Sequence, residues 1–77
     1  MEDLLELLVE PLVTDIKKVK IEKIEEEGGT KYLIHVPQEE IAKVIGRGGK
    51  MIKSIKSLAK VRAIKEGTFI NVEVVEA

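Results

Sequence analysis

The sequence predicts an α+β fold in which helices cover one face of a three-stranded mixed sheet, in the order α-β-β-α-α-β. Three observations lead to this prediction. Apolar residues recur with helical spacing in some segments and with alternating spacing in others. A glycine-rich link joins two of the helical segments. The second and third strands are separated by this helical pair, which favours parallel pairing, whereas the first two strands form an antiparallel hairpin.

Length and composition set the limits. The 77 residues suffice for a single domain, 1–77. Hydrophobic residues make up 44% and charged residues 35%, a globular balance, and there is no cysteine, which excludes a disulfide framework and thiolate chemistry. No apolar run approaches the ~20 residues of a membrane span, and the Met1-Glu2-Asp3 start lacks the positive charge of a secretory signal. We therefore expect a cytoplasmic protein that makes no use of a membrane.

Residues 2–10 form the first expected helix. Its apolar stripe consists of Leu5, Leu8 and Val9, with Leu12 one turn further on. Pro11 should end or kink the helix, because it lacks an N–H group and clashes with the preceding turn. The stripe predicts that this helix packs on the sheet. A free amphipathic helix that binds a partner is the alternative.

Three segments have the pattern of strands, namely residues 18–26, 31–36 and 69–75. In the first, Ile24 breaks the strict alternation, which is consistent with a bulge. Residues 25–29 form a polar, flexible hairpin link, and Pro37 ends the second strand. The inward faces of the second and third strands should carry Tyr32, Ile34 and Val36, and Ile70, Val72 and Val74.

Residues 38–45 and 50–64 form the remaining two helices, and the second of these has two distinct faces. Its expected core face holds Met51, Ile52, Ile55, Leu58 and Ala59. An adjoining arc of ~120° holds Lys50, Lys53, Lys56 and Lys60. Such a row of lysines is ordinarily a solvated face. Because this row begins at the glycine-rich link and contains no acid, contact with a polyanion is an equally open alternative.

The link between these helices, Val44-Ile45-Gly46-Arg47-Gly48-Gly49-Lys50-Met51-Ile52, has the properties of a phosphate site. Glycine reaches positive φ and lets another molecule approach the backbone. The helix that begins near Lys50 directs its free N–H groups and its positive dipole end out of the turn. A Walker loop is excluded because Met51 follows Gly49-Lys50, and a dinucleotide-binding motif would need a glycine at position 51. An ordinary glycine-rich turn explains one glycine, but not three with two flanking cations.

The Gly-x-x-Gly at Gly46 to Gly49, with Ile41 upstream and Ile52 downstream, resembles the KH motif, whose loop clamps about four nucleotides. Almost the whole chain resembles a type II KH domain, and specifically the KhpA family of small stand-alone bacterial KH proteins. The likeness extends to the opening Met-Glu-Asp-Leu-Leu, to Pro11-Leu12-Val13 and to the closing strand. One departure is Gly48, where a polar or charged residue is common. It leaves Arg47 as the only cation inside the loop and makes the loop more flexible.

The resemblance implies binding of single-stranded RNA in the cytoplasm with little sequence specificity, in the manner of a bacterial RNA chaperone or regulator linked to cell shape. It also implies a homodimer, or a heteromer with the larger KH protein KhpB, also called Jag. The RNA-binding residues that it implies are Gly46, Arg47, Gly48, Gly49, Lys50, Lys53, Val44, Ile45 and Ile52. The three apolar residues, with Val36, either line or back a groove between the two helices and the second strand, or belong to the core. Only Tyr32 and Phe69 are aromatic, and neither is near the loop, so we expect no base stacking and weak, salt-dependent affinity.

The net charge of −1 conceals an uneven distribution. Residues 38–65 hold eight cations and two anions, a net charge of +6, and the rest of the chain holds five cations and twelve anions, a net charge of −7. Because local potential decides where a polyanion docks, the basic segment is compatible with RNA despite the acidic total.

An enzyme is not expected. The one histidine, His35, has no obvious catalytic partner and is more readily explained as a surface residue, and Glu25-Glu26-Glu27 is more readily explained as a solvated hairpin than as a metal site. We therefore expect no catalytic or metal-binding residue, no cofactor and no small-molecule substrate. The alternative to RNA binding is a protein–protein interaction module that uses the KH helices and binds little RNA of its own.

Overall fold

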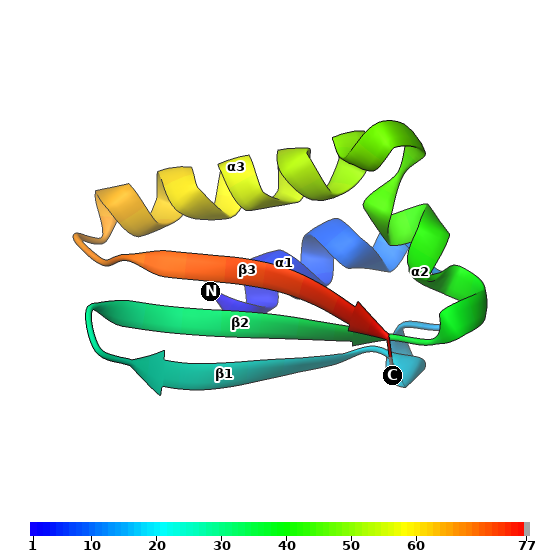
Figure 1. Ribbon diagram of the computed structural model, residues 1–77, viewed down its shortest axis with the longest axis horizontal. Coiled ribbons are helices and arrows are strands. Elements are labelled where there is room, and N and C mark those ends of the chain that lie inside the picture. Colours follow the sequence, from blue (N-terminus) through cyan, green and yellow to red (C-terminus); the bar gives the residue numbers. More distant parts are fainter. Residues whose placement is uncertain (77) are drawn as a thin grey trace.

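A computed structural model describes residues 1–76, and their elements follow the predicted order (Figure 1). The α-helices are α1 (Glu2–Val9), α2 (Gln38–Ile45) and α3 (Lys50–Lys65). The strands are β1 (Lys20–Glu26), β2 (Gly29–Val36) and β3 (Ile70–Glu76). Short 3₁₀ helices lie at Glu10–Leu12, Ile16–Lys18 and Arg47–Gly49. Among the described residues, no helix has the length and apolar character needed to cross a membrane.

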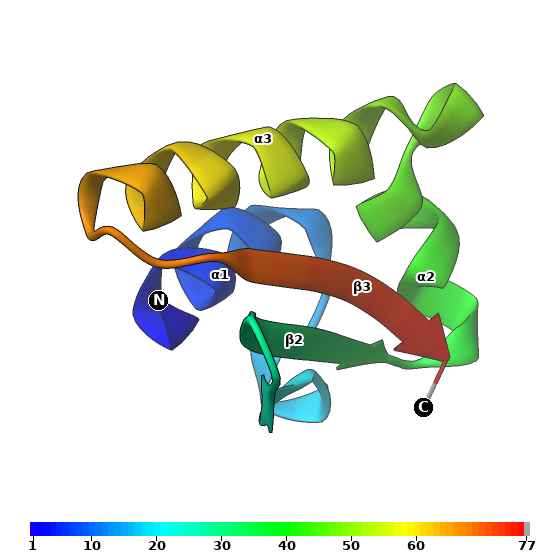
Figure 2. The ribbon, with the colours of Figure 1, turned by 60° about the vertical axis from the view of Figure 1, so that its left-hand side comes forward.

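The strands form one mixed sheet in the order β1-β2-β3, as predicted. β1 and β2 pair antiparallel, and β2 and β3 pair parallel. Figures 1 and 2 show all three α-helices on the same face of this sheet, with α3 running along β3 and α2 across the end of the sheet. The α+β prediction and its layer arrangement are therefore confirmed.

The core lies between β2 and the helices. The side chains of β2 that face the helices are buried, as predicted, and so are the apolar residues of α1 that pack on them. The buried residues of this cluster are Leu5, Val9, Tyr32, Ile34, Val36, Val44, Ile55, Ala59 and Val72. Because Leu5 and Val9 are completely buried, α1 is part of the fold, and the alternative of a free helix is wrong.

The hairpin differs from the prediction at three points. β1 begins at Lys20 rather than at residue 18, because residues 16–18 form a 3₁₀ turn whose first N–H groups are capped by Asp15, with Oδ1 of Asp15 accepting from the N–H of Lys17 at 3.0 Å. The register from Lys20 to Glu26 is unbroken, so the expected bulge at Ile24 is absent from the described strand. Glu26 pairs directly with Gly29, so the link is a two-residue turn.

The buried face of α3 is narrower than predicted. Ile55, Ala59 and Ala63 are buried, whereas Leu58 is 52% exposed and Met51 is also exposed. Both residues lie at one margin of the apolar stripe, and the sequence does not reveal where the buried part of the stripe ends. The expected third strand also begins one residue too early, because Phe69 lies outside β3 and is 79% exposed.

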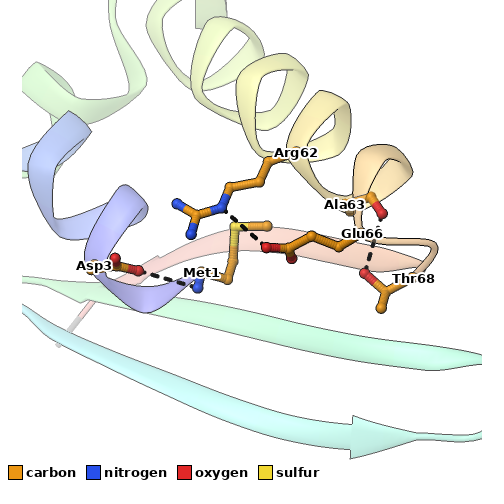
Figure 3. Close-up of polar contacts among 6 residues, drawn as sticks. All are labelled: Met1, Asp3, Arg62, Ala63, Glu66 and Thr68. Atoms are coloured by element: carbon orange, nitrogen blue, oxygen red, sulfur yellow. Dashed lines mark hydrogen bonds and ion pairs between the residues drawn. The ribbon is translucent and has the colours of Figure 1, made fainter.

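The C-terminal end of α3 is closed by polar contacts beside the start of α1 (Figure 3). The N–H of Thr68 donates to the carbonyl of Ala63 at 2.9 Å, and Arg62 Nε lies 3.3 Å from the carboxylate of Glu66. The N-terminal amine lies 3.2 Å from Asp3, and this hydrogen bond lowers the pKa of the Asp3 carboxyl. The contacts of Thr68 and Glu66 fix where the chain leaves α3.

Candidate nucleic-acid interface

The turn between α2 and α3 has a backbone that favours glycine at three positions. Gly46, Gly48 and Gly49 have φ values of 78°, 64° and 78°, in a region that side chains other than glycine seldom occupy. Figure 2 shows this turn at the corner of the molecule farthest from the sheet, before α3 begins its run along β3. The three glycines therefore expose a segment of backbone at the first turn of α3.

The three glycines are needed for different reasons. A Cβ atom at Gly46 would lie 2.6 Å from Cβ of Met51, so this position has no room for a side chain. A Cβ at Gly48 or Gly49 would meet nothing within 4 Å. At these two positions only the positive φ favours glycine, and the space above the backbone is open to another molecule.

Some amides of the turn are already used. The N–H of Gly46 donates to the carbonyl of Ala42 at 2.9 Å, and the N–H of Gly49 donates to the carbonyl of Gly46 at 3.1 Å. The N–H of Lys50 donates to the carbonyl of Arg47. In the described part of the chain, no side chain caps the N-terminus of α3, so the partial positive charge of the helix end is not offset by a capping oxygen.

The predicted cations surround this turn. Arg47, Lys50 and Lys53 are exposed, and within residues 1–76 none of them forms an ion pair. Arg62, which the sequence places in the same basic segment, is paired with Glu66 at the other end of α3. The positive charge is therefore concentrated at the turn and the adjoining flank of α3.

A groove of about 340 Å³ lies beside the turn, lined by Ile45, Ile52, Lys56, Glu73 and Val74. Two of the three apolar site residues, Ile45 and Ile52, line this groove. Val44 and Val36 are completely buried, so their side chains belong to the core. The wall opposite the helices is β3 rather than the predicted second strand, because β2 is the central strand and the helices cover it.

Sequence reasoning missed Glu40, which is the one buried charged side chain among residues 1–76. Its carboxylate accepts a hydrogen bond from the backbone N–H of Thr14, and this bond lowers the pKa of the Glu40 carboxyl. Glu40 thereby ties α2 to the segment that connects α1 with the sheet. Its position in the first turn of α2 is favourable for an anion, but no sequence pattern separates it from exposed Glu39.

The other candidates lie away from the turn. His35 is on the open face of the sheet with Nε2 3.0 Å from Glu22 Oε1. Within residues 1–76, no group of three or more His, Asp or Glu side chains is arranged to hold a metal ion. Tyr32 is buried, and Phe69 accompanies the β1–β2 hairpin, at the opposite end of the molecule from the α2–α3 turn (Figure 1).

Comparison with known proteins agrees with this architecture. Residues 2–74 match the family model described as "KhpA/KhpB, KH domain". An RNA-binding protein KhpA of Clostridium perfringens is 31% identical over 75 residues, which cover 97% of this chain and all of the relative. The RNA-binding protein KhpA of Listeria monocytogenes is 32% identical over 99% of this chain and all of the relative. That of Thermotoga maritima is 38% identical over 75% of this chain and 77% of the relative. The chain therefore belongs to the KhpA/KhpB family of KH domains.

Proposed function

We propose that this protein binds single-stranded RNA by gripping its sugar-phosphate backbone at the α2–α3 turn. The observation that carries the proposal is the run of three positive-φ glycines at an uncapped helix N-terminus, flanked by Arg47 and Lys50. Exposed backbone, a helix dipole and unpaired cations together attract phosphate. The curated relatives that are named RNA-binding proteins support the same function.

The contacts within the turn determine which of its amides and side chains can bind the RNA backbone. The N–H groups of Gly46, Gly49 and Lys50 are already occupied, so phosphate contacts fall to the amides of Arg47 and Gly48 and to the first turn of α3. The side chains of Arg47, Lys50 and Lys53 neutralise the backbone charge. Gly48 carries no side chain there, but its open position allows a phosphate to reach the backbone.

Bases lie in the groove against Ile45 and Ile52, with Val44 behind them in the core. In the described structure no aromatic ring lines this groove, so base stacking, worth ~1–3 kcal/mol per base, is not available. We expect weak binding with little sequence preference and a strong dependence on salt. Such binding fits an RNA chaperone or regulator better than a sequence-specific reader.

Weak single sites favour a dimer, because two linked sites gain avidity without new contacts. An exposed apolar row on α3, formed by Leu58, Val61 and Ile64, offers the surface, with exposed fractions of 52%, 54% and 69%. The same row is open to a larger KH partner of the KhpB type. It is also the observation that favours the second candidate function, a protein-interaction module with little RNA binding of its own.

Fluorescence polarisation of a short labelled single-stranded RNA, at low and moderate salt, tests the RNA-binding proposal. The decisive variant is Arg47→Asp with Gly48→Asp, since aspartate tolerates positive φ better than most residues. The matched control is Lys65→Asp with Gly67→Asp, at the other end of α3. It introduces the same charge change, and Gly67 also has positive φ and open space around it.

The expected result is saturable binding by the wild type that weakens with salt, a large loss for the loop variant and little change for the control. Circular dichroism verifies that both variants are folded. If the loop variant binds RNA as well as the control does, the loop mechanism is wrong. If even the wild type fails to bind at low salt, the interaction-module function is favoured instead.

A further inference from the structure

We infer that the lysines of α3 extend the RNA site beyond the glycine turn, so that Lys56 and Lys60 hold phosphates that follow the nucleotides gripped by the loop. This inference rests on the proposed function. It assigns the site a longer substrate than the about four nucleotides that a Gly-x-x-Gly loop clamps.

The geometry of α3 places these lysines in line with the loop. At 100° per residue, Lys53, Lys56 and Lys60 fall on one flank of the helix, and all three are exposed. Lys56 also lines the groove beside Ile45 and Ile52. The flank therefore adjoins the groove through Lys56, and a strand that leaves the turn beside the groove along α3 passes Lys53, Lys56 and Lys60 in order.

Within residues 1–76, the lysines of this flank form no ion pair, and Glu73, the acid that lines the groove with Lys56, is paired with Lys31 at 3.3 Å. Between Lys50 and Lys65, α3 contains no acidic residue. Within residues 1–76, none of the three flank lysines takes part in an ion pair, whereas Lys23, Lys31 and Arg62 each have a carboxylate within 3.4 Å. Figure 3 shows Arg62 turned toward Met1 and Glu66. Other lysines, such as Lys43 and Lys65, are also without an ion pair in the described residues, but the three flank lysines share one side of α3, and one of them, Lys56, lines the groove.

The length of the flank limits the extension. Lys53 and Lys60 are seven residues apart, which is about 10 Å along a helix. This distance accommodates roughly two or three phosphates of a single strand. Beyond Lys60 the flank continues with Ile64, which is apolar and 69% exposed, and α3 ends at Lys65. The acidic β1–β2 hairpin also lies at that end (Figure 1). The site should therefore hold about six or seven nucleotides in all.

Oligouridylates of four, eight and twelve nucleotides test the inference by fluorescence polarisation over a range of salt concentrations. The variant is Lys60→Gln, and the control is Lys65→Gln, which removes an exposed lysine from another face of the same helix. If the site held only four nucleotides, the eight-nucleotide RNA would bind roughly fivefold more tightly than the four-nucleotide RNA, because it offers several registers. The wild type should exceed this gain. Extension to twelve nucleotides should add only a statistical gain.

Lys60→Gln should reduce the affinity for the eight-nucleotide RNA and lower the slope of log Kd against log salt by about 0.7, the value for one phosphate contact on a single strand. Binding of the four-nucleotide RNA should not change, and Lys65→Gln should leave all three RNAs unaffected. Lys60→Glu should enlarge the effect on the eight- and twelve-nucleotide RNAs and still leave the four-nucleotide RNA unchanged.

The outcomes separate this inference from the proposed function. If only the loop variant weakens binding and the eight-nucleotide RNA shows no more than the statistical gain, the extended site is wrong and the loop function stands. If Lys60→Gln weakens binding but the loop variant does not, the loop function is wrong. If Lys65→Gln acts like Lys60→Gln, the attraction is diffuse and the extended site is again wrong.

Discussion

The carboxylate of Glu40 accepts a hydrogen bond from the backbone N–H of Thr14, which lies 26 positions earlier in the chain. The bond connects the first turn of α2 to the segment between α1 and β1, and Glu40 is only 5% exposed. Because α2 also supplies one side of the glycine turn, this contact helps to set the position of the candidate site relative to the rest of the fold.

Glu40 should make the stability of the protein sensitive to acid. Its pKa is lower in the folded than in the unfolded state, mainly because of the hydrogen bond from Thr14. Its contribution is therefore fully present above the ordinary glutamate pKa and is lost as the pH falls through the lowered value. Urea unfolding between pH 7 and pH 3 should show a smaller acid loss for Glu40→Gln than for the wild type. The exposed neighbour substitution Glu39→Gln should keep the wild-type profile, and identical profiles for all three proteins would contradict the role of Glu40.

Gly46→Ala should destabilise the protein more than the same change at Gly67. Both glycines have positive φ, which is strained for alanine, and Gly46 at φ 78° and ψ 171° lies in a region almost restricted to glycine, where strain costs about 1–3 kcal/mol. At Gly46 the new Cβ also meets Met51 at 2.6 Å, and such overpacking adds roughly 1–3 kcal/mol. At Gly67 the space is open. Chemical denaturation followed by circular dichroism measures the difference, and equal losses would show that the contact with Met51 relaxes freely.

Truncation of the two aromatic residues should lower the stability of the protein to very different extents. Tyr32 is 6% exposed in the core, so Tyr32→Ala should cost about 3–5 kcal/mol, which is most of the stability of a domain this small. Phe69 is 79% exposed, so Phe69→Ala should change stability by less than about 0.5 kcal/mol. Thermal unfolding distinguishes the two. A large loss for Phe69→Ala would mean that the ring is covered in solution, for instance by another chain.

The apolar row on α3 should control self-association. Val61→Lys with Ile64→Lys places two charges on this row and should convert a dimer to a monomer of 8.6 kDa in light scattering after gel filtration. Ala42→Lys with Asn71→Lys, at two exposed positions off α3, should leave the dimer intact. A wild type that remains monomeric at high concentration would contradict the homodimer and leave the row to a different partner.

Much of the fold could be predicted because local patterns and chain connectivity agree. Alternation in β2, the stop at Pro37 and helical spacing on either side of the glycines specify the element order. The crossover between β2 and β3 then specifies parallel pairing. The glycine turn was also predictable, since three glycines and two cations in so short a stretch between helices are typical of a backbone that phosphate can approach.

The errors arose where a residue's environment depends on distant parts of the chain. Leu58 fits the apolar period of α3 but is 52% exposed, whereas small Ala63 gives a weak signal and is buried. The groove wall was assigned to β2 from the family resemblance, although the predicted pairing already placed β3 at an edge of the sheet. The burial of Glu40 could not be predicted, since its hydrogen-bond partner is a backbone N–H from another part of the fold.

The acidic hairpin and the basic turn lie at opposite ends of a molecule whose longest dimension is 34 Å (Figure 1). With a net charge of −1, the protein as a whole is not drawn to a polyanion from a distance, but its charge separation gives it a preferred orientation in the field of one. A molecule that rotates in this field arrives with the glycine turn foremost and the hairpin trailing. The acidic residues would thus raise the fraction of productive encounters through orientation. Neutralising Glu25, Glu26 and Glu27 raises the net charge from −1 to +2 and should speed association at low salt more than it alters dissociation, while the preferred orientation is weakened.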